Sequence, residues 1–247
     1  GRGQGGGGGG GEVSVRETLA GMRRDLRTVL ATPVYVWLVL GYIGYTAALG
    51  VFQYYGPEAG LETFGLTSSD TIFGLVTVVA GIGGTAAGGW LLDRVGSSMT
   101  NAMGMGAVSL LLSFAIIAAA FLFAEPAWLF IAAFFVGELL MFVVQAPLNG
   151  TTIWCVPDDV RPFAMSTLTI LIHLLGDVPA PPLVGLLKDK LDAAHCEDPP
   201  HCGRNWRYAL ALATGTLLLG SAALWVGVGH ARSARDYREG KVGGGPG

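Results

Sequence analysis

The sequence predicts an all-α integral membrane protein with six transmembrane helices. Only 13% of its 247 residues are Asp, Glu, Lys or Arg, whereas soluble domains carry about 25%. The charges are concentrated between long uncharged blocks, each close to the roughly 20 residues that a helix needs to cross a hydrocarbon core. Backbone polar groups in lipid must be satisfied internally, so blocks this long and continuous indicate helices. A soluble protein with six buried helices is disfavoured, because the blocks lack a polar face.

Two short elements precede the first block. Residues 5–11 are an unbroken glycine run, which is typical of the end of a flexible linker. Residues 12–30 interleave the apolar Val13, Leu19, Met22, Leu26 and Val29 with Arg16, Arg23, Arg24 and Arg27. This pattern predicts a basic amphipathic helix at the membrane surface, with a calmodulin target as the alternative. We therefore divide the chain into a linker and surface helix (1–31), a membrane part (32–230) and a polar tail (231–247).

Six apolar blocks make up the membrane part. They cover residues 33–55, 71–92, 101–124, 127–156, 162–187 and 208–228. The fourth block contains one charged residue, Glu138, and the fifth contains His173 and Asp177. Each block is long enough to span a bilayer as one helix.

The distribution of Lys and Arg predicts the orientation of the spans. An even number of spans returns the chain to its starting side, which therefore holds eleven basic residues: Arg2, Arg16, Arg23, Arg24, Arg27, Arg94, Arg161, Arg232, Arg235, Arg238 and Lys241. The opposite side holds four, namely Lys188, Lys190, Arg204 and Arg207. We expect both termini in the cytoplasm. The sequence leaves the organelle open between the plasma membrane and an endolysosomal membrane.

Small residues in the first two spans predict close helix packing. Gly84 and Gly88 form a GxxxG pair that Ala80 extends, and Gly41 and Gly44 offer a similar face in the first span. Helices in lipid gain little from burying apolar side chains against each other, so they approach closely through small residues. Such faces serve either static packing or sliding of the helices.

Three ionisable residues lie near the middle of the spans, where a charge costs about 2.5–3.5 kcal/mol on insertion scales. His173 and Asp177 are four residues apart and therefore share one helix face. A His beside a carboxylate can relay protons near neutral pH. Pro179, Pro181 and Pro182 follow and should break or kink the helix, which frees carbonyl groups beside the acid.

The alternative for His173 and Asp177 is a structural hydrogen bond to a neighbouring helix. The same alternative holds for Glu138, whose neighbours Gln145 and Asn149 suggest a polar stripe along the fourth span. We expect Glu138, His173 and Asp177 to lie on a substrate and proton pathway, because broken helices near mid-membrane are where transporters place their sites.

Cys196 and Cys202 lie in the loop between the fifth and sixth blocks. That loop is on the predicted non-cytoplasmic side, which is oxidising, so the pair suggests a disulfide. His195 and His201 lie beside the cysteines and make metal ligation the weaker alternative, and we assign neither a metal nor a cofactor.

The loop between the second and third blocks resembles a known signature. Gly89, Asp93, Arg94 and Gly96 match the Gly-x-x-x-Asp-Arg-x-Gly pattern of the major facilitator superfamily, which lies on the cytoplasmic loop between the second and third helices of each six-helix half. The resemblance implies that these residues form a conformational latch, with Asp93 at a helix N-terminus and Arg94 pairing across a helix end.

Longer strings resemble the spinster branch of that superfamily. The most specific is His173-Leu-Leu-Gly-Asp-Val-Pro179, with Pro182-Leu-Val-Gly185 after it and weaker matches at Asp70-Thr-Ile-Phe-Gly74 and Gly137-Glu138. The resemblance implies the C-terminal half of a twelve-helix transporter that moves lysophospholipids or sphingolipids, in some cases with protons. Its partners would be the bilayer, the lipid-like or small-molecule substrate and an N-terminal six-helix half that this sequence does not contain.

Other classes of function fit the sequence less well. A transporter of a sugar or an organic anion, and a non-transporting fragment that needs a partner half, stay open. An enzyme is not expected, because no Gly-x-Ser-x-Gly or His-Glu-x-x-His motif occurs. A net charge of -3 gives no electrostatic basis for binding nucleic acid.

Overall fold

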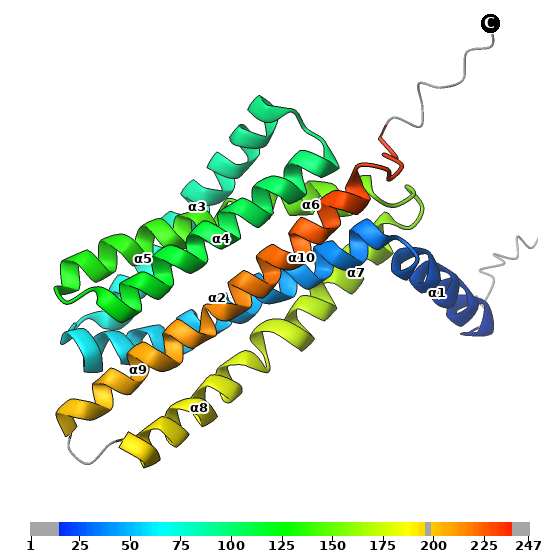
Figure 1. The fold of residues 1–247 in the computed structure, drawn as a ribbon. Coiled ribbons are helices and arrows are strands. Elements are labelled where there is room, and N and C mark those ends of the chain that lie inside the picture. The colour runs from blue at the N-terminus through cyan, green and yellow to red at the C-terminus, as the bar shows by residue number, and fades with distance from the viewer. Residues whose placement is uncertain (1–14, 196–198, 239–247) are drawn as a thin grey trace, which may run out of the picture.

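A computed structural model describes residues 15–195 and 199–238, which form helices and short connections without any strand. Six helical stretches in this part are long and apolar enough to cross a membrane: Pro33–Phe64, Ser69–Val95, Met99–Phe123, Ala127–Trp154, Arg161–Ala193 and Asn205–Ala231. They coincide with the six predicted blocks, so the predicted six-span membrane fold is confirmed. The last three spans are each interrupted by a local break (Figure 1).

The first two helices meet at a sharp corner. α1 (Val15–Leu30) is the predicted amphipathic helix, and it ends before Thr32, whose backbone is extended. α2 (Pro33–Phe64) begins with a proline, which suits the first helical position because no hydrogen-bond partner exists there for its backbone nitrogen. The corner turns α1 across the ends of the spans, as Figure 1 shows.

The next helices run back and forth beside α2. α3 (Ser69–Val95) connects to α4 (Met99–Phe123) through a short loop, and α5 (Ala127–Phe142) continues as α6 (Gln145–Trp154). The break between α5 and α6 has a local cause. Pro147 has no N–H to donate to the carbonyl of Val143 one turn earlier, so the regular ladder is interrupted there.

The fifth and sixth spans complete the bundle. The fifth comprises α7 (Arg161–Ile172), the π-helical turn η1 (His173–Asp177) and α8 (Ala180–His195). The sixth comprises α9 (Pro199–Ala213) and α10 (Gly215–Ala231).

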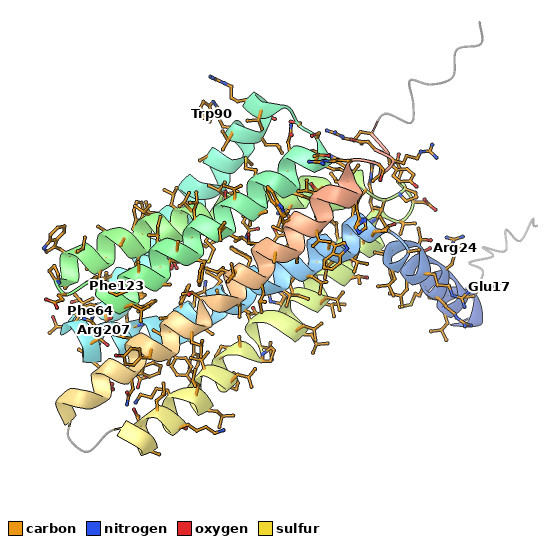
Figure 2. All side chains as sticks on the ribbon, in the orientation of Figure 1. Glu17, Arg24, Phe64, Trp90, Phe123 and Arg207 are labelled. Carbon is orange, nitrogen blue, oxygen red and sulfur yellow. The ribbon has the colours of Figure 1, made fainter. Side chains whose placement is uncertain are left out.

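α2 is the central helix of the bundle. It contacts α3, α10 and η1, and also α8 and α9. Its buried side chains meet a core of large apolar residues, in which the rings of Phe52, Phe121 and Phe134 lie within about 6 Å of one another. At the same end of the bundle, the guanidinium of Arg207 lies 4.8 Å from the ring centre of Phe64 (Figure 2).

The spans are not equally enclosed by protein. In the most apolar window of the α2 span 67% of residues are buried, against 28% for the α3 span and 17% for the α7–α8 span. The exposed side chains on α3 and α7–α8 are large and apolar, for example Leu75, Ile82, Ile170 and Leu183. These two spans therefore present faces that lipid or another membrane segment must cover.

Both ends of the described chain lie at the same end of the bundle. Figure 1 shows α1 and the segment after α10 there, together with the α3–α4 loop and the connection from α6 to α7. This arrangement follows from an even number of spans.

Candidate functional site

A polar cavity of about 360 Å³ lies between α2, α6 and the α7–η1 segment. Its polar lining consists of Tyr42, Tyr45, Thr46, Gln53, Gln145, Asn149, Thr169, His173 and Asp177. Leu49, Met165, Leu168 and Ile172 supply the apolar part of the wall. The structure therefore brings His173 and Asp177, predicted from sequence, to one cavity.

The π-helical turn at the cavity wall follows from the local sequence. The N–H of Val178 donates to the carbonyl of His173 five residues earlier at 3.1 Å, which is the spacing of a π-turn. The three prolines at 179, 181 and 182 lack the N–H groups that would continue a regular helix. The hydroxyl of Thr46 on α2 lies 3.1 Å from the carbonyl oxygen of Ile172 and provides a donor beside the bulge. The predicted break in this span is present, in the form of a π-helical turn.

Two glycines allow this turn to lie against α2. A Cβ added to Gly50 would lie 2.7 Å from Cβ of Asp177, and one added to Gly176 would clash with the hydroxyl of Thr46. Neither position can accept a side chain unless a neighbouring atom shifts. The position of Asp177 is thus fixed by close backbone contact as well as by its own helix.

His173 and Asp177 form a pair at the cavity wall. Nδ1 of His173 lies 2.8 Å from Oδ2 of Asp177, and their side chains are 57% and 32% exposed in this chain. Among the described residues, Oδ1 of Asp177 is buried and has no hydrogen-bond partner. The pair can share a proton.

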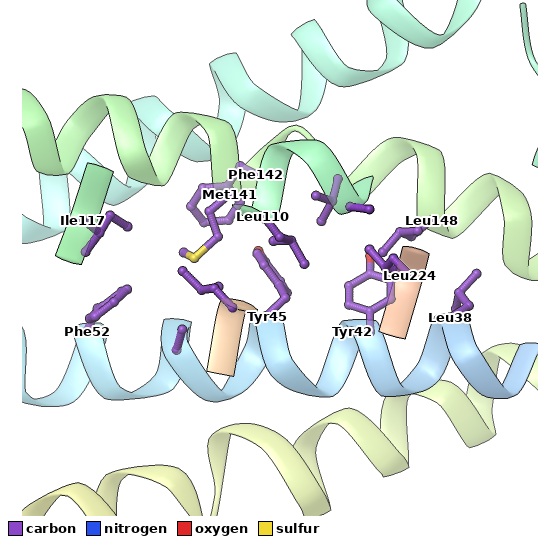
Figure 3. Close-up of a cluster of buried hydrophobic side chains, with 14 of the residues drawn as sticks. Leu38, Tyr42, Tyr45, Phe52, Leu110, Ile117, Met141, Phe142, Leu148 and Leu224 are labelled. Carbon is purple, nitrogen blue, oxygen red and sulfur yellow. The ribbon is translucent and has the colours of Figure 1, made fainter. Parts of the chain in front are cut away.

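Four further side chains form a hydrogen-bond network across the cavity. The hydroxyl of Tyr42 donates to Oε1 of Gln145 at 2.7 Å and lies 3.1 Å from Oδ1 of Asn149. The amide of Gln145 donates to the hydroxyl of Tyr45 at 2.8 Å. Figure 3 shows both tyrosines directed from α2 toward the side of Phe142 and Leu148.

The sequence reasoning identified Gln145 and Asn149 as a polar stripe but missed Tyr42 and Tyr45. A signal for them is present in the sequence. Polar residues recur at 42, 45, 46 and 53 on α2, at intervals of three, one and seven residues that keep them on one face of a helix.

Glu138 is not among the residues that line this cavity. It is fully buried on α5, and the hydroxyl of Thr77 on α3 lies 3.0 Å from its Oε2 and 3.2 Å from its Oε1. The residue projects from the face of the fourth span that meets α3, while Gln145 and Asn149 lie beyond the α5–α6 break and meet α2. The expected place of Glu138 on a substrate and proton pathway stays a prediction.

Of the predicted latch residues, Gly89, Asp93 and Arg94 lie in the last two turns of α3, and Gly96 follows the end of this helix. The hydroxyl of Ser97 donates to Asp93 at 2.9 Å, and Gly96 adopts a φ of +98°, which favours glycine. The guanidinium of Arg94 lies 4.6 Å from the ring centre of Trp90 on its own helix. Within residues 15–195 and 199–238 it forms no ion pair across a helix end, so the expected partner of Arg94 is not found there. Gly89 faces Ala146 of α6 at ordinary contact distance.

The predicted disulfide cannot be located, because Cys196 and the side chain of Cys202 lie outside the described residues. Cys155 is a free, buried thiol at the end of α6. No group of three or more potential metal ligands occurs among the residues that the structure describes.

A second cavity, of about 410 Å³, lies on the other side of the contact between α2 and η1. It is lined by aliphatic side chains of α2, α8 and α10, with Thr216 as the one polar side chain. The lining contains no ionisable group, so the polar cavity is the stronger candidate for a functional site.

Comparisons with known proteins agree with this architecture. The chain is 38% identical over 206 residues to a probable sphingolipid transporter, spinster homolog 1, of Arabidopsis thaliana, and 39% identical over 206 residues to spinster homolog 2 of the same plant. Residues 9–125 match the model of the organic anion transporter polypeptide family. These proteins are named as transporters, in agreement with the expectation that the chain is not an enzyme.

A solved structure shows the same fold. It is the crystal structure of a bacterial homolog of the human lysosomal transporter spinster, in an inward-facing and unoccupied conformation, with a TM-score of 0.73 at 14% identity. The match covers 91% of this chain and 53% of the solved one. The chain spans about two fifths of the length of the two plant relatives, 39% and 40%.

Proposed function

The chain is a spinster-like six-helix half of a major facilitator bundle, and from this premise we propose that it is the C-terminal half of a secondary transporter for a sphingolipid or lysophospholipid. The substrate class rests on the names of the plant relatives, which are probable sphingolipid transporters. Transport proceeds by alternating access, in which the two halves of the bundle rock around a site near the membrane midplane.

One observation carries the proposal: His173 and Asp177 form a pair at a broken turn in the wall of a polar cavity. The carboxylate of Asp177, whose side chain is 32% exposed, offers an acceptor for the ammonium or hydroxyl group of a lipid head. The hydroxyl and amide groups of Tyr42, Tyr45 and Gln145 supply further donors and acceptors for a polyhydroxylated head group.

Proton coupling is part of the proposal. A proton that binds to or leaves the His173–Asp177 pair changes the charge of the cavity wall and therefore its affinity for a charged head group. The π-helical turn supports this role, since irregular turns within membrane helices mark places where the helix can bend.

A second six-helix half is the proposed partner. The weakly enclosed α3 and α7–α8 spans provide apolar faces for another half to cover. The excess of Lys and Arg on this side of the spans supports a cytoplasmic location of both chain ends.

The test is uptake of a fluorescent sphingolipid into liposomes that hold this chain together with a complementary six-helix half. We expect Asp177→Asn and His173→Ala each to lower uptake by about tenfold to a hundredfold, a range matched to the loss of one charge-assisted contact. Asp70→Asn, on the first turn of α3 and outside the cavity, is the control and should leave uptake unchanged. Unchanged uptake in both cavity variants would remove the proposed site.

A second candidate function is the transport of an organic anion, because an organic anion transporter family matches residues 9–125. The lining of the polar cavity favours the lipid: it contains a carboxylate and, among the described residues, no Lys or Arg. Competition between the fluorescent sphingolipid and a sulfate-conjugated steroid separates the two. Strong competition by the steroid would favour the anion.

A further inference from the structure

Within residues 15–195 and 199–238, no protein segment covers the exposed apolar stripe of α1. Leu19, Met22, Leu26 and Leu30 lie three or four residues apart on one helix face and are between 40% and 58% exposed. Val29, at the edge of this stripe, is buried among residues of the core, and α1 contacts α2 and α7. The bundle therefore holds the base of α1 but leaves its apolar face open.

The direction in which the apolar stripe points can be inferred from the residues on the opposite face of α1. Figure 2 places Arg24 and Glu17 on the side of α1 that is turned away from the spans. At 3.6 residues per turn, Arg24 is rotated by roughly 140° from Leu19 and by roughly 160° from Leu26. The apolar stripe is consequently directed toward the plane in which the spans enter the membrane.

Two arginines border the stripe on one side. Arg23 and Arg27 are one turn apart and are rotated from Leu19 by roughly 40° and 80°. Both are exposed, and neither has an acidic partner within residues 15–195 and 199–238. Arg24, on the far side, is paired with Asp25 at 3.1 Å. The unpaired positive charge is therefore concentrated next to the apolar stripe.

We propose that α1 is a docking surface for anionic phospholipids of the leaflet at this end of the bundle. The apolar stripe enters the boundary between head groups and acyl chains, and Arg23 and Arg27 bind the phosphate groups. A calmodulin-like protein fits less well, because such a partner encloses its target helix, whereas the Val29 side of α1 is occupied by the bundle. This inference does not depend on the substrate of the transporter.

The experiment measures backbone hydrogen exchange of residues 15–30 in the full chain, held in nanodiscs of phosphatidylcholine alone or with phosphatidylserine. We expect exchange to slow when phosphatidylserine is present, by about fivefold for each arginine at the anionic surface. High salt should reverse the slowing, because it screens charges at the surface.

Two variants separate the contributions of the helix. Arg23→Gln together with Arg27→Gln should abolish the difference between the two lipid compositions, whereas the control Arg24→Gln should retain it. Leu26→Ser should speed exchange in both compositions, because it removes part of the apolar stripe. Equal exchange in both compositions for the unaltered chain would overturn the proposal. So would protection of α1 that appears only on addition of calcium and calmodulin.

A loss of lipid dependence in α1 with unchanged sphingolipid uptake would leave the proposed transport intact. Conversely, loss of uptake in the Asp177→Asn variant with unchanged exchange in α1 would leave the docking surface intact. The two proposals can therefore fail separately.

Discussion

The two carboxyl groups deep in the spans, Glu138 and Asp177, have opposite surroundings. Glu138 lies in the closed α3–α5 contact, fully buried, with its oxygens at hydrogen-bond distance from Thr77. Asp177 lies at a bulged turn beside a polar cavity, with one oxygen near His173 and the other without a partner among the described residues. A carboxyl group in the membrane part is thus fully enclosed and hydrogen-bonded in one case, and partly exposed beside a cavity in the other.

The backbone explains this difference. In the α3–α5 contact, Gly84 and Gly88 let α3 approach the carbonyls of Leu139 and Val143 directly, so no space remains beside Glu138. Between α2 and α6, the rings of Tyr42 and Tyr45 separate the helices and leave polar groups around a cavity. Small residues let α3 and α5 pack closely, and large polar side chains keep space open between α2 and α6.

The largest expected effect tests the close contact between α3 and α5. A side chain at Gly88 would run into the carbonyl oxygen of Val143, whereas the nearest atom to one at Gly83 is Cδ1 of Leu139 at 4.0 Å. We expect Gly88→Leu to lower the free energy of unfolding by about 3 kcal/mol or more, because the backbones must separate. Gly83→Leu, the matched control on the same helix, should be tolerated. Thermal unfolding in detergent micelles, followed by circular dichroism, measures both.

An equal loss of stability in the two variants would contradict the close backbone contact of α3 and α5. It would show instead that any large residue in this span is disruptive.

The next effect concerns Glu138. We expect Glu138→Ala to cost about 2–4 kcal/mol, because it leaves a cavity and removes the partner of the Thr77 hydroxyl. Glu138→Gln keeps the shape and a hydrogen-bond acceptor, so it should restore most of this loss. The same unfolding measurement applies. If Gln costs as much as Ala, a charge on Glu138 is required, and the comparison of the two carboxyl groups must be revised.

The sequence predicted the fold more fully than the site. Long uncharged blocks predict spans because the bilayer requires them, and all six were found. The prolines after Asp177 predict a break because they remove backbone donors, and the break is present at η1. Both predictions depend on local properties of the chain.

The grouping of residues around the cavity depends on which helices meet, and local properties do not contain this information. Glu138 and Asn149 belong to one predicted span, yet the break near Pro147 separates them between α5 and α6, which meet different partners. Tyr42 was missed because a tyrosine in an apolar block suits core packing as well as a polar site. The contact of Gly50 with Asp177 joins positions 127 residues apart in the chain.

The contact of Gly50 with Asp177 gives a prediction for the polar cavity between α2, α6 and the α7–η1 segment. A Cβ at Gly50 would lie 2.7 Å from Cβ and 2.9 Å from Cα of Asp177, so Gly50→Ala should displace η1. We expect a loss of stability of about 1–2 kcal/mol from overpacking, partly offset by the better helix propensity of alanine, and a loss of uptake similar to that of Asp177→Asn. Gly74→Ala on α3, where no atom lies within 4 Å of the added methyl group, is the control. Normal uptake in Gly50→Ala would show that the position of Asp177 against α2 is unimportant.

The smallest expected effect concerns the segment after α10, which contacts both the loop beyond α3 and the end of α6. The guanidinium of Arg238 donates to the carbonyl oxygen of Ser97 beyond α3 and lies 3.8 Å from the ring centre of Trp154 at the end of α6. Its hydrogen bonds to Asp236 hold the pKa of that carboxyl below its ordinary value, while partial burial opposes the shift. Arg161 lowers the pKa further through its charge.

A carboxyl group with a lowered pKa in the folded protein stabilises the fold above its unfolded pKa of about 3.9, and this stabilisation is lost as the pH falls through the folded value. Asp236→Asn should therefore lower stability at pH 7 by less than about 1 kcal/mol, because the pair lies near the surface, and should cost nothing at pH 2. Unfolding of the variant and the unaltered chain at the two pH values measures the difference. A loss that persists at pH 2 would mean that the segment depends on the shape of Asp236 rather than its charge. It would also mean that packing of this segment on Trp154, rather than its charges, holds the ends of α3 and α6 together.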